Sequence, residues 1–436
     1  MRRWGRAGLG AAILALTLLA AAPSVAQNSK LDPVGVAYVK LALGVAQHDP
    51  NYLDAYFGPQ AWVDEAKAHP GSTAELEAEA DRLMGEAAGV DPHGLSRLER
   101  KRRAFLESQL RAVRAKLAML DGQTLSYLDE AQALYGVRPE LPALTSFDPA
   151  LARIDALVPG PGPLSDRVAA YRAGFVVPKD RLEPVMRAAL AECRRRTRAH
   201  IVLPKGEHVD LEIVSGKPWA AYNWYKGQGH SLIQVNTDYP MQLDHALELA
   251  CHEGYPGHHV HNALLEQRLA VARGWAEFEV YPLSTPFFFV AEGMGNSAVN
   301  IAFSETDRAR FERDVLFPLA GLPPAQAQAY VALSLAVKVL NPAAMTITAA
   351  YIDGRIDKPT AVHQIQTYAV LGPDQAEQSV GLMSYFRSYG VNYGAGERLV
   401  RRFVEGGGTA TREQQWRRYS SLLTTPTVPS DLQPRR

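Results

Sequence analysis

The stretch HEGYPGHHVH, from His252 to His261, constrains the fold more than any other part of this chain. The residues before it, LDHALELACHE, are typical of a helix, but Pro256 lacks the N–H that would bond to the carbonyl of His252. The proline ring also clashes with that carbonyl, and Gly257 allows backbone conformations that other residues avoid. The sequence therefore predicts a helix that bends or opens between its first histidine and the next ones.

The histidine spacing suits a metal only if this helix is irregular. In an ideal helix, side chains six positions apart differ in direction by about 240°, so His252 and His258 could not bind one ion. A bulge at residues 255–257 that absorbs two residues would bring His258 to the place of the second histidine in the shorter motif H-E-x-x-H. His259 stays open as the alternative ligand. Glu253 follows the first histidine, as the glutamate of that motif does.

A third ligand is needed, because a catalytic zinc site with an open position has three protein ligands. Glu292, forty positions after His252, lies at the start of the apolar segment VAEGMGNSAVNIAF. A solvated face does not explain a carboxylate there, although a helix N-terminus would also favour one. Asn296, one turn later, either orients this carboxylate or faces solvent. The residues predict one zinc ion, bound by His252, His258 and Glu292.

Helical patterns dominate the rest of the chain, so the predicted fold class is mostly α. Apolar residues form one stripe from Ser96 to Leu120 with charges around it, which indicates a long amphipathic helix. Between Glu207 and Asp238, the β-branched or aromatic runs VDLEIV, AAYNWY and SLIQVNT are separated by turn residues. These runs predict a small β element directly before the histidine-bearing helix.

The first residues predict an exported protein. MRRWGRAGLGAAILALTLLAAAPSVAQ combines a basic start, an apolar stretch and small residues, which is typical of a cleavable secretory signal at residues 1–26; a retained membrane anchor is the alternative. We expect no later segment to cross a membrane. The mature chain, residues 27–436, is predicted to be one helical domain, periplasmic or secreted. It would consist of a helical N-terminal part, 27–205, and a metal-site part, 206–436.

Charge and cysteine content limit the partners and the kinds of site that this chain can have. Lys and Arg together number 46, as do Asp and Glu, so no basic excess indicates a nucleic-acid partner. Cys193 and Cys251 are the two cysteines of the chain, which excludes a disulfide framework. The absence of a C-x-x-C pair argues against a thiolate zinc site. A single bridge can form after export, but a buried free thiol is the more frequent outcome.

HEGYPGHH, followed by AEG, resembles the bacterial family labelled domain of unknown function 885, whose members carry H-E-x-x-P-G-H and a later E-G-W or a relative. The resemblance extends over most of the mature chain, including LDAYFGP, KPWAAYNWY, SLIQVNTDYP and YGVNYGAG. That family is similar to the zincin metallopeptidases. The resemblance implies a zincin-like fold, Glu253 as general base and three zinc ligands: His252, His258 and Glu292. The family often has Gln where His261 stands and Trp where Met294 stands.

These residues together predict a zinc metallopeptidase with peptide substrates. Zinc makes water acidic enough to lose a proton near neutral pH, and Glu253 can take that proton and pass it to the leaving amine. The developing oxyanion needs a second donor, for which Tyr393 and Tyr389 are candidates, and the resemblance favours Tyr393. In zincins an edge strand pairs with the substrate, and SLIQVNT occupies that place. The alternative is a metal-dependent binding protein or a non-peptide amide hydrolase on the same scaffold.

Overall fold

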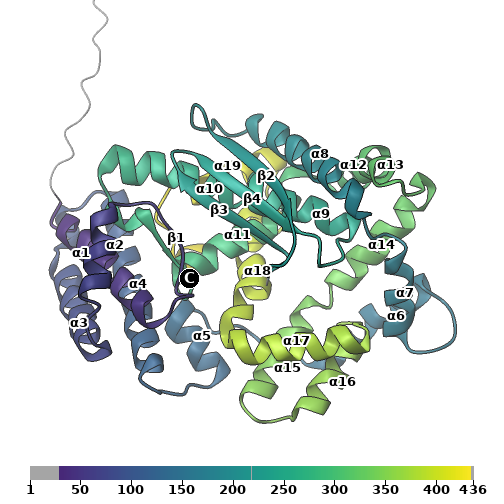
Figure 1. Cartoon of the computed structure of the whole chain (residues 1–436), viewed down its shortest axis with the longest axis horizontal. Coiled ribbons are helices and arrows are strands. Elements are labelled where there is room, and N and C mark those ends of the chain that lie inside the picture. Colours follow the sequence, from purple (N-terminus) through teal and green to yellow (C-terminus); the bar gives the residue numbers. More distant parts are fainter. Residues whose placement is uncertain (1–28, 218, 434–436) are drawn as a thin grey trace, which may run out of the picture.

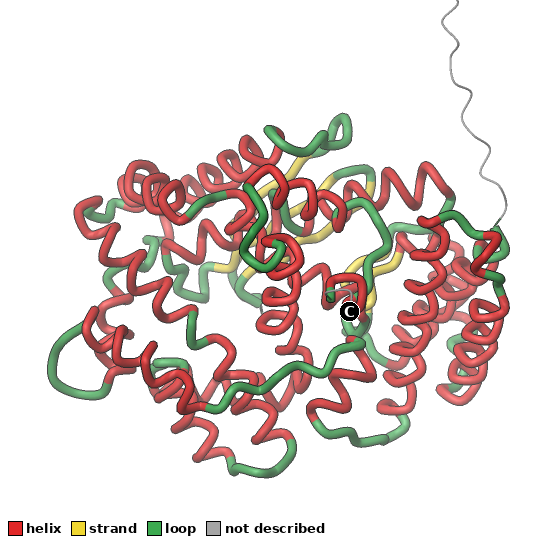
Figure 2. The backbone as a smooth tube through the Cα atoms, turned by 180° about the vertical axis from the view of Figure 1, so that it is seen from behind, coloured by secondary structure: helices red, strands yellow, loops and turns green. Residues whose placement is uncertain are grey.

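The structure is a computed structural model that describes residues 29–217 and 219–433. Helices make up most of the described chain, and its strands are short (Figure 2). The predicted fold class, mostly α with a small β element before the histidine-bearing helix, is confirmed. The predicted signal sequence, residues 1–26, lies outside the described residues.

The N-terminal helices form a group at one end of the molecule (Figure 1). They are α1 (Asp32–His48), α2 (Gln60–Ala68), α3 (Thr73–Gly89) and α4 (Arg97–Leu120). α4 starts where the sequence predicts because Ser96 and Glu99 form a capping box: the Glu99 N–H donates to the Ser96 hydroxyl at 3.2 Å, and the Ser96 N–H donates to the Glu99 carboxylate at 3.0 Å. Leu106, Leu110 and Val113 of its apolar stripe are buried within this group.

Further helices precede and follow the small sheet. The first are α5 (Tyr127–Tyr135), α6 (Asp148–Leu157), α7 (Leu164–Ala173) and α8 (Lys179–Arg198). The later ones are α9 (Leu243–Leu249), α10 (His258–Leu265), α11 (Pro286–Ala302), α12 (Glu305–Phe311), α13 (Phe317–Ala320), α14 (Ala327–Lys338), α15 (Asn341–Ile352), α16 (Lys358–Tyr368), α17 (Pro373–Phe386), α18 (Glu397–Glu405) and α19 (Arg412–Leu422). Each of the two largest apolar clusters contains residues from both sides of position 205, so the N-terminal part and the metal-site part share their cores.

The three predicted runs form one sheet of β2 (His208–Val214), β3 (Ala221–Gly227) and β4 (His230–Asn236), in the order β2-β4-β3. β4 lies in the middle, parallel to β2 and antiparallel to β3, so the prediction of SLIQVNT as an edge strand is wrong. The edge strand that contacts the histidine motif is β3, whose Asn223 amide donates to the backbone carbonyl of Glu253 at 2.7 Å. A second pair, β1 (Leu53–Tyr56) with β5 (Val280–Pro282), is antiparallel and was not predicted.

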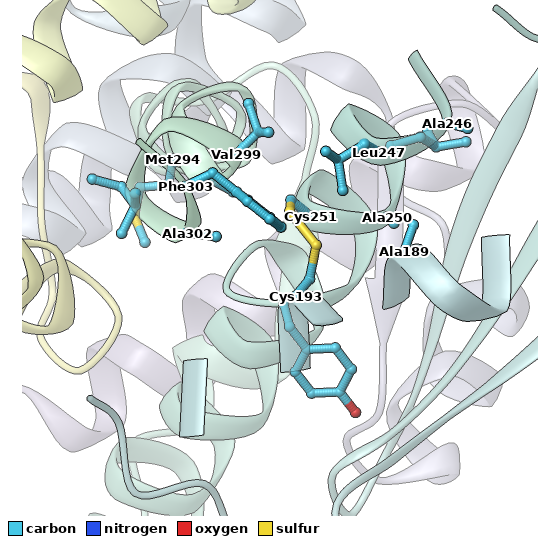
Figure 3. Packing of buried hydrophobic residues seen from close by; sticks show 14 of the residues in the cluster. Ala189, Cys193, Ala246, Leu247, Ala250, Cys251, Met294, Val299, Ala302 and Phe303 are labelled. Carbon is cyan, nitrogen blue, oxygen red and sulfur yellow. A yellow bond between two sulfur atoms is a disulfide. The ribbon is translucent and has the colours of Figure 1, made fainter. Parts of the chain in front are cut away.

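Cys193 and Cys251 form a disulfide that joins α8 to the residue before His252. The expectation of buried free thiols is therefore wrong. Cys251 lies on a short irregular helix, η3 (Ala250–Gly254), that packs against α8 and brings together two cysteines 58 positions apart. The apolar residues around the bridge include Ala189, Leu247, Val299 and Phe303 (Figure 3).

One described stretch, Pro324–Ile352, is long and apolar enough by length and composition to cross a membrane, contrary to the expectation from the sequence. The structure divides it into α14 and α15, and 50% of its most apolar window is buried. Leu333, Ala336 and Leu340 pack with Ile154 of α6 in a separate apolar cluster. The buried half of this window therefore belongs to the core of the protein.

Candidate metal centre

The histidine motif begins on a helix that changes its geometry and then stops. α9 continues as η3, a π-type stretch that carries His252 and Glu253. Tyr255 has an extended backbone, and α10 begins at His258. The predicted opening at Pro256 is confirmed, but the predicted bulge within one helix is wrong, because the chain leaves the first helix and starts another. The two histidines therefore belong to separate helical segments, and π-type turns are frequent at functional sites.

Gly257 lets the chain fold back on itself at this break. Its N–H donates to the carbonyl of Cys251 at 3.0 Å. A Cβ atom at this position would lie 1.8 Å from the carbonyl oxygen of His252 and 2.5 Å from that of Cys251. These neighbours are backbone atoms, so no side-chain rotation can relieve the clash. The close approach therefore requires glycine.

Gly257→Ala is expected to destabilise the protein by about 3 kcal/mol or more, because this overpacking cannot be relieved by side-chain movement. Thermal unfolding and the zinc content of the purified variant measure the effect. Gly85→Ala is the matched control: Gly85 is exposed within α3 with no atom near an added Cβ, and alanine there stabilises the helix by about 0.5–1 kcal/mol. Equal unfolding temperatures for Gly257→Ala and wild type would rule out the close approach.

The three predicted ligands converge at the break. The Nε2 atom of His258 lies 3.2 Å from one carboxylate oxygen of Glu292, and the Nε2 atom of His252 lies 3.7 Å from the other. The two rings are nearly perpendicular, with centroids 4.6 Å apart. Gly295 leaves room for the ring of His252, since a Cβ at 295 would come within 2.8 Å of it. Atoms about 2.1 Å from a zinc ion at a tetrahedral angle are about 3.4 Å apart, so these separations fit one ion.

Glu292 gives the strongest sign that a cation fits here. α11 begins at Pro286, so Glu292 lies inside the helix and a helix N-terminus does not explain it. Its side chain is 5% exposed, and its Oε2 atom is buried with no hydrogen-bond partner among the described residues. Asn296 donates to the backbone carbonyl of Glu292 at 2.9 Å rather than to its carboxylate. A buried carboxylate oxygen without a donor is costly, and a metal ion would satisfy it.

Burial and charge shift the pKa values of the three predicted ligands. Burial lowers the pKa of His252 to about 4, so this ring is neutral and able to bind a metal at neutral pH. Burial also lowers the pKa of His258, but the hydrogen bond to Glu292 and nearby carboxylates outweigh this effect and raise that pKa to about 9. Burial raises the pKa of Glu292, yet the two histidines hold it below its usual value. A metal ion would replace the proton that His258 shares with Glu292.

The other two histidines of the motif, His259 and His261, are buried outside the group of three predicted ligands. The Nε2 atom of His259 lies 3.0 Å from the Glu207 carboxylate, and its Nδ1 atom lies 2.9 Å from the Ser231 hydroxyl, so both ring nitrogens are engaged in the core. His261 is buried, which lowers its pKa to about 3. The geometry therefore favours His258 over His259 as the second ligand.

Glu253 lies next to the three predicted ligands but is not one of them. Its carboxylate is 3.9 Å from the Nε2 atom of His252, and its side chain is 13% exposed. Burial raises its pKa to about 7, and the carboxylates of Glu292 and Asp54 act in the same direction. A carboxylate with a pKa near neutrality can both take and return a proton.

The structure adds Asp54 and Tyr222, which the sequence prediction did not single out. The Tyr222 hydroxyl of β3 donates to the Asp54 carboxylate of β1. Burial raises the pKa of Asp54 to about 6, and the charges of His258 and Glu292 also act on it. Both residues therefore lie near the metal centre. The sequence could have pointed to these two residues because Asp54 lies in LDAYFGP and Tyr222 lies in KPWAAYNWY, two of the segments that carry the family resemblance.

Tyr393 and Tyr389 approach the centre from the C-terminal part of the chain. Tyr393 lies on η9 (Asn392–Gly396), another π-type turn, which packs against α11. Desolvation of the hydroxyl raises the pKa of both phenols, and the charge of Glu292 adds to this effect. The charge of Glu253 also acts on Tyr393. Tyr393 is 46% exposed overall, so its side chain remains accessible to a ligand.

Comparisons with known proteins inform the fold. No family model and no curated protein matches this chain. A candidate lipoprotein from Colwellia psychrerythraea is similar over 86% of this chain and 68% of its own, with 13% identity and a TM-score of 0.50. A candidate lipoprotein of unknown function from Shewanella oneidensis covers 83% and 71%, with 14% identity and a TM-score of 0.47. An M32 carboxypeptidase from Deinococcus radiodurans R1 covers 91% and 89%, with 14% identity and a TM-score of 0.41. This chain thus shares the overall fold of the Colwellia protein.

Proposed function

We propose that this protein is a metal-dependent hydrolase, with zinc as its ion and peptides as its substrates. The observation that supports this most is the position of Glu253, a carboxylate of near-neutral pKa beside three metal-type ligands and outside their set. Hydrolysis needs a base next to the metal, whereas a binding protein does not. Two imidazoles and a carboxylate also form the ligand set of catalytic zinc sites that keep one position open.

The residues of the chain divide the proposed reaction between them. When bound, zinc supplies a Lewis acid that polarises a carbonyl and makes water more acidic. The two histidines and Glu292 hold the ion, while Glu253 takes the proton of the attacking water and later gives it to the leaving amine. The Asn223 amide fixes the backbone of Glu253 from β3. The phenol of Tyr393 donates to the oxygen that gains negative charge.

Tyr393→Phe is expected to lower peptide hydrolysis by about 10²–10³-fold without changing the zinc content, because one donor to the oxyanion is lost. Peptide turnover and metal content, measured on one preparation, check this. Tyr389→Phe is the matched control, since it makes the same chemical change on the neighbouring phenol and is expected to cost less. A larger loss of peptide hydrolysis in Tyr389→Phe than in Tyr393→Phe would identify Tyr389 as the donor to the oxyanion.

β3 offers an extended peptide a path to the centre. It is an edge of the described three-stranded sheet, so one row of its backbone groups has no strand partner in that sheet. An added strand gains backbone hydrogen bonds with little choice of sequence. The Asn223 contact with Glu253 would place such a strand beside the base. We therefore assign to β3 the role that the sequence predicted for SLIQVNT.

A peptide-library digest combined with metal analysis tests the proposed function. We expect the purified protein to contain zinc and to cleave peptides, to stop when a chelator removes the metal, and to resume when zinc is returned. A zinc-loaded wild type that cleaves no peptide would contradict the peptidase assignment. A non-peptide amide hydrolase or a metal-dependent binding protein would then replace it.

Export is the second part of the proposal. The disulfide between Cys193 and Cys251 supports it, because disulfides persist in oxidising compartments and are rare in the cytosol. We expect the mature chain to begin near Gln27, as measured by N-terminal sequencing of protein recovered from the periplasm or the medium. An intact Met1 on a membrane-bound product would support the retained anchor instead.

A further inference from the structure

A second group of metal-type side chains lies on the small sheet and shares no residue with the metal centre. His208 and Asp210 belong to β2, and His230 begins β4. His208 pairs with His230 in the parallel register, and Asp210 lies two residues further along β2. Alternate positions of a strand share a face, so all three side chains project from the same face of the sheet.

These three side chains are nearly as close as the ligands of one ion. The Nε2 atom of His230 lies 2.9 Å from a carboxylate oxygen of Asp210. The rings of His208 and His230 stack, with centroids 4.1 Å apart and planes 15° apart. One donor atom from each side chain lies within 4.8 Å of the others. Ligands of one zinc ion are about 3.0–3.5 Å apart, so small shifts of these side chains would complete the set.

A hydrogen bond prepares the ring of His208 for a metal. Its Nδ1 atom lies 3.2 Å from the carbonyl oxygen of Gly206, which can only accept, so Nδ1 carries the proton. The lone pair then remains on Nε2, and a backbone carbonyl behind a metal-binding histidine is the usual arrangement. Two imidazoles and one carboxylate suit zinc, nickel or copper better than magnesium or calcium.

A surface ion pair alone explains only part of this group. It accounts for His230 with Asp210, but it leaves out the second imidazole, His208, which stacks on the ring of His230. We propose that His208, Asp210 and His230 bind a second divalent ion of the zinc class, independent of the catalytic one. The ion would tie the edge strand β2 to the central strand β4 at the residues where both begin.

This position gives the second ion a structural role. Glu207 directly precedes His208, and its carboxylate accepts from the Tyr255 hydroxyl at 2.7 Å and lies 3.0 Å from the Nε2 atom of His259. Tyr255 lies in the break of the histidine motif, and His259 follows the ligand His258. An ion that fixes the start of β2 therefore also fixes a carboxylate that supports the metal centre.

Zinc stoichiometry of the full chain separates the two sites. In the double variant His252→Ala/His258→Ala the first centre has lost two ligands, so zinc that remains bound belongs to another site. By equilibrium dialysis with metal analysis, we expect chelator-stripped wild type to bind two zinc ions and this double variant to bind one. Adding His208→Gln should weaken the remaining binding at least about 100-fold, because losing even an outer partner of a ligand costs about 10–100-fold.

His48→Gln, added to the same double variant, is the matched control. His48 is also exposed and also has a ring nitrogen bonded to a backbone carbonyl, that of Gly71 at 2.9 Å, so zinc binding should not change. Circular dichroism checks folding, and Asp210→Asn replaces His208→Gln if the latter does not fold.

Two outcomes would overturn the second site. One is a folded His252→Ala/His258→Ala protein that binds no zinc, and the other is an equal loss of binding with His48→Gln. Zinc that is lost when His208→Gln is added to the double variant would support this second site, and a zinc-loaded wild type without peptidase activity would at the same time contradict the proposed function.

Discussion

Glu253→Gln is expected to slow peptide hydrolysis by about 10²–10⁴-fold and to leave the zinc content at the wild-type level. The substitution keeps the size and hydrogen-bonding capacity of the side chain but removes the base. Glu253 lies outside the set formed by His252, His258 and Glu292, so the ion keeps all of its protein ligands. The measurement is kcat at saturating peptide, with the metal content determined on the same sample.

Glu279→Gln is the matched control for this variant. Glu279 is a half-buried glutamate on η5 (Ala276–Glu279), and burial raises its pKa as it does for Glu253. The charges that act on Glu279 come from Glu266 and Glu277 rather than from the metal ligands. We expect wild-type turnover. A Glu253→Gln protein that is as fast as wild type would exclude Glu253 as the base, and the proposed mechanism with it.

His258→Ala is expected to remove the zinc ion of the His252, His258 and Glu292 centre and all measurable hydrolysis, a loss at least as large as that of Glu253→Gln. The neighbouring variant His259→Ala should keep its zinc and lose stability instead. The two ring nitrogens of His259 contact the Ser231 hydroxyl and the Glu207 carboxylate. A buried polar group that loses its hydrogen-bond partner lowers the free energy of unfolding by about 1–3 kcal/mol. Metal analysis of the folded proteins, together with thermal unfolding, separates the two effects.

His245→Ala serves as the control for removing a histidine from this stretch. His245 is exposed on α9, so we expect both the zinc content and the unfolding temperature to stay unchanged. Zinc that is lost from a folded His259→Ala protein but kept by His258→Ala would reverse the ligand assignment.

Features that depend on neighbouring residues could be predicted from the sequence. Ser96 and Glu99 mark the start of α4 within one helical turn. Pro256 removes a hydrogen bond of its own helix, so a single residue locates the break. The apolar neighbours of Glu292 already argued against a solvated face, and the structure brings this carboxylate to His252 and His258.

Features that depend on distant segments could not be predicted in this way. A β-branched run such as SLIQVNT suits the middle or the edge of a sheet, and its place depends on the pairing of β4 with β2. The bridge between Cys193 and Cys251 depends on the packing of α8 against η3. Asp54 lies on β1, which is held by its pairing with β5. The proline shows where the helix opens, but the width of the opening depends on what the next helix packs against.

The glycines around the metal centre bear on how similar centres can be recognised in other proteins. The motif H-E-x-x-P-G-H and a later glutamate identify the proposed ligands and the proposed base, but they do not describe the space that the backbone needs. Gly257 lies against the backbone of His252, and Gly295 lies against its ring. A Cβ at Gly293 would come within 2.5 Å of the backbone oxygen of Gly396, where α11 meets η9. A search pattern that requires these glycines as well as the proposed ligands would separate chains that can form this centre from chains that contain the motif residues but lack the space for it.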